Sequence, residues 1–127
     1  MIHLCHNLKK MIKIVKQYFT LDEVTFIAFY PWPLFKLQFL YGKKVHIQQL
    51  VEHTHMFIVK WAYSHRFGLD AEYDVLTPEI VEKFHKKGLE INCWTVDDNV
   101  TLEKMEALGV DYITTNAFDQ NNKTKEA

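Results

Sequence analysis

Side chains that could act on a substrate or hold a metal ion gather in the middle of the chain. Residues 64–68 read SHRFG, and residues 72–74 read EYD. A histidine can transfer protons, and two alternating acids can face one divalent cation. One hypothesis is therefore a metal site built from His65, Glu72 and Asp74. The alternative, which we favour, is that these residues form a solvated loop.

The other histidines are expected at the surface or at helix ends. His3 and His6 flank Cys5 near the N-terminus, where a zinc ion would still lack at least one ligand. His53 and His55 alternate as in a strand, but no acidic or cysteine cluster completes them. We therefore predict no catalytic group and no metal site in this chain.

Length, composition and charge indicate one soluble globular domain. The chain has 127 residues, 48% of them hydrophobic, and its net charge of −1 gives no bulk attraction to nucleic acid or to an anionic membrane surface. Pro31, Pro33 and Lys36 interrupt the most apolar window, so no transmembrane segment is expected. Cys5 and Cys93 are far apart and follow no secretory leader. We therefore expect free thiols and a cytoplasmic location.

Helix and strand patterns alternate along the chain. The spacing of apolar residues and the capping signals predict helices at residues 7–19, 34–41, 77–87 and 98–108, and strands at 24–29, 45–51, 91–96 and 110–114. The apolar run at 24–29 is typical of a strand covered on both faces. Residues 52–68 show no clean period. The alternation indicates βα units and a parallel sheet in an α/β fold, about half of a (β/α)8 barrel.

The most specific motifs lie between Gly88 and Asn116, with one signal upstream. Their sequences are HKKG at residues 85–88, WTVDD at 94–98, GVDYITTN at 109–116 and LTPEIV at 76–81. Together they resemble the end of the glycerophosphodiester phosphodiesterase family, which adopts a TIM barrel. Residues 24–29 lie where that family has a strand ending in Ser-Phe, with Ala28 in place of the serine. The resemblance runs from about residue 8 to residue 116 and covers only the C-terminal half of the barrel, about strands five to eight.

The resemblance implies a parent enzyme that hydrolyses glycerophosphodiesters to glycerol 3-phosphate and an alcohol, using a divalent cation such as Ca²⁺ or Mg²⁺. Its His-Arg-Gly and Glu-x-Asp motifs, a second histidine and a further acid lie in the other half of the barrel. SHRFG and EYD resemble these motifs only superficially, because their positions are wrong. We therefore expect residues 1–116 to be a partial domain without cofactor or hydrolytic groups, and residues 117–127 to be a polar tail. Met1 falls inside a helix of the family pattern, which suggests an internal start.

Three residues are candidates for binding substrate at the carboxyl ends of the strands. Trp94 could stack on a glycerol or headgroup chain at the mouth of the barrel, although it could equally be a core residue. Phe29 and Asp97 follow strands in the same way, although Asp97 could instead cap the next helix. The aromatic segment at residues 30–33 lies on the same rim, where it could shape the pocket or cover apolar surface.

A half-barrel would have unpaired edge strands and an exposed inner face. The chain would then be inactive alone and would meet a glycerophosphodiester only when completed by a separate N-terminal half. The alternative is a non-enzymatic half-barrel that forms a homodimer through its exposed sheet edges.

Overall fold

A single parallel sheet organises the structure, a computed structural model that describes residues 2–53 and 56–117. The sheet has five strands in the order β1-β2-β3-β4-β5, and every neighbouring pair is parallel. The strands are β1 (Thr25–Ala28), β2 (His46–Val51), β3 (Gly68–Glu72), β4 (Ile91–Trp94) and β5 (Tyr112–Ile113). The predicted parallel α/β fold is confirmed.

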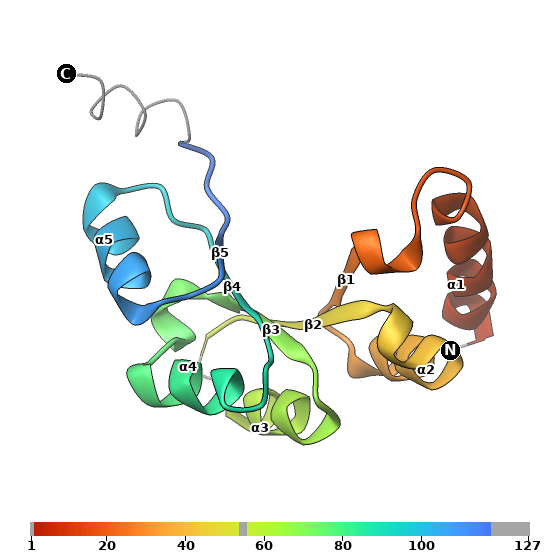
Figure 1. The fold of residues 1–127 in the computed structure, drawn as a ribbon, viewed down its shortest axis with the longest axis horizontal. Coiled ribbons are helices and arrows are strands. Elements are labelled where there is room, and N and C mark those ends of the chain that lie inside the picture. Colours follow the sequence, from red (N-terminus) through yellow and green to blue (C-terminus); the bar gives the residue numbers. More distant parts are fainter. Residues whose placement is uncertain (1, 54–55, 118–127) are drawn as a thin grey trace.

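Five α-helices connect and flank these strands. They are α1 (Ile2–Val15), α2 (Pro31–Tyr41), α3 (Met56–His65), α4 (Pro78–His85) and α5 (Asn99–Leu108). Short 3₁₀ turns lie at η1 (Leu21–Glu23), η2 (Gly42–Lys44) and η3 (Tyr73–Val75). The helices follow one another around one side of the sheet, from α1 to α5, and leave its other side open (Figure 1). Within the part of the chain that the structure describes, no helix is long and apolar enough to cross a membrane.

The central strand β3 was missed by the sequence pattern, which predicted about four strands and a solvated loop between residues 64 and 74. Residues 68–71 are instead fully buried or nearly so. Gly68 is required where this strand begins, because a Cβ added there would lie 2.6 Å from the carbonyl oxygen of Glu90. The glycine therefore marks a close approach of two backbones rather than a surface turn.

Two further expectations are corrected in the N-terminal half. α2 begins at Pro31 rather than at residue 34, because a proline in the first turn of a helix loses no hydrogen bond. Residues 25–28 of β1 alternate between exposed and covered, and Ile27 is 51% exposed. Only one face of β1 is therefore covered, because the helices lie on one side of the sheet. The unassigned stretch at residues 52–68 contains α3.

The C-terminal elements form where their capping signals predict them. The Thr77 hydroxyl accepts a hydrogen bond from the Ile80 N–H at the start of α4. The Asp98 carboxylate caps α5 by accepting from the Thr101 N–H at 2.9 Å. Gly109 ends that helix in the left-handed conformation, with φ of 75°. Residues 118–127, most of the predicted polar tail, lie outside the described residues.

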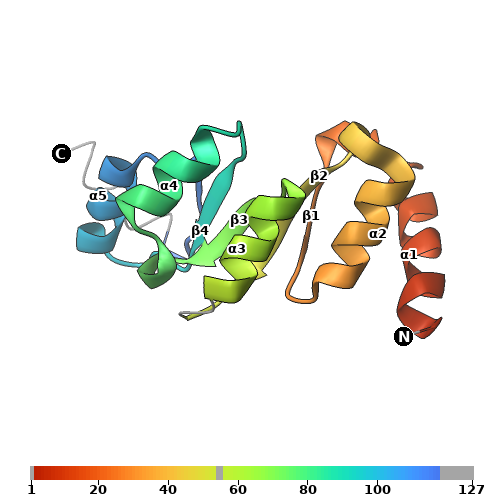
Figure 2. The same ribbon diagram turned by 90° about the horizontal axis from the view of Figure 1, so that it is seen from below.

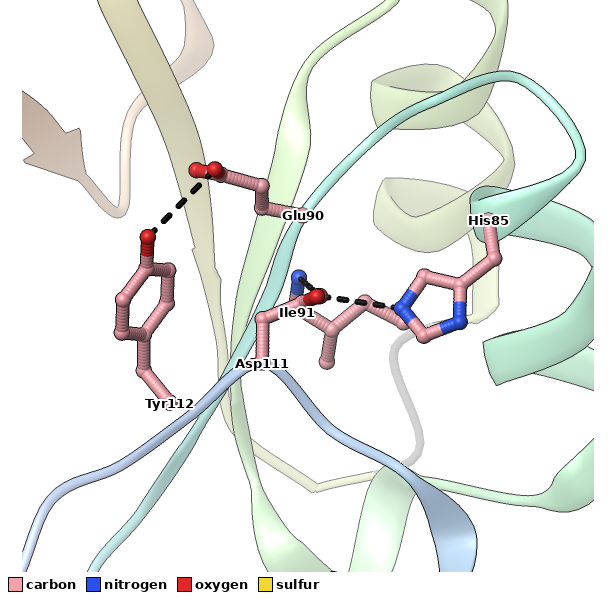
Figure 3. Close-up of polar contacts among 5 residues, drawn as sticks. All are labelled: His85, Glu90, Ile91, Asp111 and Tyr112. Atoms are coloured by element: carbon pink, nitrogen blue, oxygen red, sulfur yellow. Dashed lines mark hydrogen bonds and ion pairs between the residues drawn. The ribbon is translucent and has the colours of Figure 1, made fainter.

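Asp111 links the end of α4 to β4, at the amino ends of β4 and β5 (Figure 3). One carboxylate oxygen accepts from the Ile91 N–H at 2.8 Å and lies 2.9 Å from His85 Nε2. The neighbouring Tyr112 hydroxyl reaches Glu90 at 3.4 Å. In parallel barrels this end of the strands serves stability rather than chemistry, which gives the aspartate of GVDYITTN a structural role.

Candidate functional site

The carboxyl ends of the five strands meet at the opposite edge of the sheet, where βα barrels place their active sites. Phe29 comes directly after β1, and Trp94 is the last residue of β4. The two rings meet edge to face, with centroids 6.4 Å apart and planes at 87°. Two strands separate β1 from β4, so the inward curvature of the sheet brings the rings together. This pairing could not be anticipated from the sequence.

Both aromatic side chains are positioned by polar contacts. The Trp94 indole donates a hydrogen bond to the Asp70 carbonyl oxygen at 3.0 Å, and the ring stays partly exposed. The buried Gln49 amide donates to the carbonyl oxygens of Ala28 and Phe29 at 2.9 and 2.8 Å, which fixes the backbone from which Phe29 projects. A ring that is held but still half open can offer its face to a ligand.

Asp97 accepts hydrogen bonds from the segment after β5 and does not cap α5. Its carboxylate accepts from the Asn116 N–H at 2.7 Å, the Thr115 hydroxyl at 3.2 Å and the Asn116 side-chain amide at 3.3 Å. The Asn116 N–H holds the pKa of Asp97 below its ordinary value. Asp97 therefore joins the segment after β4 to the segment after β5 at the rim of the site.

A row of polar side chains crosses the open face of the sheet next to Trp94. The sequence pattern did not predict this row. The Asn92 amide donates to the Asp70 carboxylate at 2.7 Å and to the Thr114 hydroxyl at 3.1 Å. Asp70 is only 4% exposed, and burial raises its pKa, with the Asn92 hydrogen bond opposing that shift. Gln48, also buried, lines the same open hollow from β2. The signal in the sequence was a lone acid between the apolar residues Leu69 and Ala71.

A second cluster joins the loops after β2 and β3. His53, Glu72 and Asp74 each offer one ligand atom, and the three atoms lie within 4.8 Å of one another. His53 Nδ1 lies 3.2 Å from a Glu72 oxygen, which also accepts from the His53 N–H at 3.1 Å. The prediction that no acidic group completes His53 is therefore wrong. His55 lies outside the described residues, as do the side chains of His3, Cys5 and His6.

His65 does not join this cluster, which corrects the hypothetical set of His65, Glu72 and Asp74. It ends α3, near the amino ends of the strands, and its ring stacks on Trp61 with centroids 3.9 Å apart. Its Nδ1 also lies 2.9 Å from the Trp61 carbonyl oxygen. His65 therefore serves helix packing.

The described residues do not assemble a cage for the Ca²⁺ or Mg²⁺ that the family resemblance implies. Ca²⁺ takes six to eight oxygen ligands, and the cluster at His53 supplies two carboxylates together with an imidazole that those ions do not favour. That imidazole is also already paired with Glu72. No chemical step can be assigned to a metal held by this cluster.

The chain matches the family model described as the glycerophosphoryl diester phosphodiesterase family over residues 3–120. A curated glycerophosphodiester phosphodiesterase from Caldanaerobacter subterraneus subsp. tengcongensis is 33% identical over 116 residues. That alignment covers 84% of this chain and 44% of the relative.

Solved structures repeat the fold. A glycerophosphodiester phosphodiesterase from Parabacteroides distasonis superposes with a TM-score of 0.79 and 26% identity, over 96% of this chain and 51% of that one. An Oleispira antarctica phosphodiesterase, solved with the product sn-glycerol-3-phosphate, gives a TM-score of 0.75 at 14% identity, over 94% of this chain and 49% of that one. At that identity the likeness concerns the fold alone.

The chain thus spans about half the length of the relatives that it matches. Five parallel strands with flanking helices match the barrels of these relatives, and the family match covers nearly the whole chain. The chain belongs to the glycerophosphoryl diester phosphodiesterase family.

Proposed function

We propose that this chain is the C-terminal half of a glycerophosphodiester phosphodiesterase barrel and supplies the substrate-facing wall of the pocket, without the hydrolytic groups. The observation that carries the proposal is the family match over residues 3–120 together with coverage of about half of each relative. The motifs at residues 94–98 and 109–116 resemble the end of the family pattern, so this chain would correspond to the C-terminal half of that pattern. The completed enzyme would release glycerol 3-phosphate and an alcohol.

The number of strands revises which part of the barrel this half would occupy. The sequence pattern suggested strands five to eight. If β5 is the eighth strand of the barrel, the five strands count back to the fourth. A barrel formed in this way would pair β1 and β5 with strands of the other half.

Trp94 and Phe29 would form the apolar wall against which the glycerol or the headgroup chain packs. Their edge-to-face pair leaves both rings partly open at the carboxyl edge, next to the hollow lined by Asp70 and Asn92. Asp97 would act as a positioning residue, because its oxygens already accept from Thr115 and Asn116. Phosphate binding, proton transfer and the divalent cation would come from the N-terminal half.

A chimaera tests this division of labour. The N-terminal part of the Caldanaerobacter relative, up to the start of the matched region, is fused to this chain, and release of glycerol 3-phosphate from glycerophosphocholine is measured with Mg²⁺ or Ca²⁺. We expect turnover from the chimaera and none from the chain alone. In the chimaera, Trp94→Ala should raise KM about tenfold or more, because it removes an aromatic contact of roughly 1.5 kcal/mol. Metal-dependent turnover by the isolated chain would contradict the proposal.

The second candidate is a non-enzymatic homodimer that buries the open face. Its support is that Ile27 is 51% exposed and Tyr112 is 53% exposed on the two outermost strands. Size-exclusion chromatography with light scattering measures whether the chain is a dimer. A stable dimer that does not hydrolyse the substrate, and that does not exchange its partner for an N-terminal half, would favour this candidate.

A further inference from the structure

The outer surface of α2 is apolar, although it faces solvent. Trp32, Phe35 and Phe39 recur at helical spacing and are 70%, 40% and 80% exposed. The opposite side of the helix buries Leu34 and Leu37 against the sheet, each 1% exposed. Apolar helix surface is normally covered by other parts of a protein, whereas these three aromatic side chains stay exposed.

A further exposed aromatic side chain lies on the next helix, α3. Phe57, near the start of that helix, is 76% exposed. Phe35 of α2 meets His65, at the end of α3, edge to face at 6.0 Å, and Figure 2 shows both helices flanking the sheet. We call the surface formed by Trp32, Phe35, Phe39 and Phe57 the aromatic face.

Completion of a barrel would not cover this face. In a (β/α)8 barrel the helices form the outer ring, and α2 and α3 connect strands within the sheet rather than at its edges. A missing half would pair with β1 and β5 and pack beside the outermost helices. The aromatic face would therefore stay exposed in a completed barrel, whether or not the function proposed above is correct.

The net charge of −1 hides a strong separation of charge along the chain. Residues 1–66 contain nine Lys and Arg against three Asp and Glu, and residues 67–127 contain six against thirteen. Between residues 24 and 66 the only acid is Glu52, against four lysines and Arg66. The net charge of the whole chain therefore does not describe this part of the sequence.

Lysines accompany the aromatic residues along this part of the chain. Lys36 lies one turn after Trp32 on α2, and Lys60 lies one turn after Phe57 on α3. Lys43 and Lys44 lie in η2, directly after α2, and line a hollow together with Asp22. Neither helix contains a carboxylate. Aromatic residues flanked by lysines are the composition of helices that lie in the interface of an anionic bilayer.

We propose that the aromatic face docks on the surface of a bilayer containing anionic phospholipids, with the α2 and α3 aromatic side chains in the headgroup region and the lysines on the lipid phosphates. Charge complementarity selects this occupant over a second copy, because two identical basic faces meeting about a two-fold axis would repel each other. The docking is peripheral and reversible.

Vesicle co-sedimentation of the full chain tests the proposal, with phosphatidylcholine vesicles compared with vesicles that also contain phosphatidylglycerol. We expect binding to the anionic vesicles only, weakened by added salt. Phe39→Ser should reduce the partition coefficient about tenfold, because it removes an aromatic side chain that docking would bury in the bilayer. The pair Lys43→Glu and Lys44→Glu should reduce it by a similar factor or more, since each lysine near the surface contributes about 1 kcal/mol.

The acidic half of the molecule offers a matched control. Val100 on α5 is 78% exposed, close to the 80% of Phe39, so Val100→Ser and Lys104→Glu should leave vesicle binding unchanged. Circular dichroism checks that each variant is folded. Equal loss from both sets of variants, or absence of binding by the folded wild-type chain, would overturn the proposal. So would a dimer in light scattering that Phe39→Ser dissociates while no vesicle binding occurs, because the face would then belong to a second copy.

Discussion

The two faces of the sheet differ in what covers them, although the same strands form both. On the helix side lie Leu69, Ala71, Ile91 and Cys93, each 0% exposed. Their chain neighbours on the open side include Asp70 and Asn92, which are linked by a hydrogen bond. The helix side is completed within this chain, while the open side carries polar groups and half-exposed aromatic rings. Stability therefore resides on one face and the candidate site on the other.

Cys93 lies on the covered face, and its burial there lowers the reactivity expected of its thiol. Burial raises the pKa of this thiol to about 11, with the charge of Asp70 adding to the shift. The thiol is therefore protonated at physiological pH and packs as a small apolar group. The open face, in contrast, exposes groups that a second protein segment or a substrate could still contact.

The largest effect should come from the covered face. Leu69→Ala leaves a cavity in the middle of the core and should lower the free energy of unfolding by about 2–5 kcal/mol. Urea denaturation followed by circular dichroism measures this loss. A cost below about 1 kcal/mol would mean that the helices do not pack on the central strand as described.

A substitution that increases stability is expected at Asp70, the buried acid of the open face. Because the folded-state pKa of Asp70 is raised, the folded protein holds its proton more tightly, and stability falls as pH rises from the unfolded-state pKa of about 3.9 through the folded-state value. Asp70→Asn removes this loss and keeps an amide oxygen that accepts from Asn92. The variant should melt at a higher temperature than the wild type at pH 7.

The acid limit supplies the control for this prediction. At a pH well below 3.9 the carboxyl group is protonated in both states, so the difference between Asp70→Asn and the wild type should vanish. A difference that is independent of pH would show that packing, and not the buried charge, distinguishes the two proteins.

The smallest effect should come from an apolar residue of the open face. Ile27 is 51% exposed, while the preceding residue, Phe26, is 7% exposed. Ile27→Thr should change the stability of the isolated chain by no more than about 0.5 kcal/mol. The same substitution should weaken binding to an N-terminal half by several-fold, because barrel closure would bury this residue. A large loss of stability in the isolated chain would mean that the open face is already covered.

The sequence predicted those parts of the fold whose local signals agree with the tertiary structure. Thr77 and Asp98 start helices, and Gly109 ends one, because caps act within a few residues of themselves. The sequence did not predict β3 because three of its five residues, Gly68, Asp70 and Glu72, are uncommon in strands. In the structure these residues lie on the open face of the sheet. α3 escaped because apolar residues occupy several of its sides, and this hides the helical period.

The positions of two aromatic residues of the candidate site were predictable, but their contact and the polar residues next to them were not. Phe29 and Trp94 could be placed at strand ends from the alternation of elements, and the structure locates them there. Their contact depends on the curvature of the sheet across two intervening strands. The approach of His53 to Glu72 likewise depends on the register of β2 with β3, which no local pattern records.

The most direct test of the central claim is a comparison of phosphodiester hydrolysis by the isolated chain and by the chimaera that restores an N-terminal half. Glycerol 3-phosphate release is followed in both samples, with the same divalent cation and with folding verified by circular dichroism. The account predicts turnover by the chimaera and none by the isolated chain. Equal turnover per mole from the two proteins would contradict it, because this half would then contain the hydrolytic groups itself.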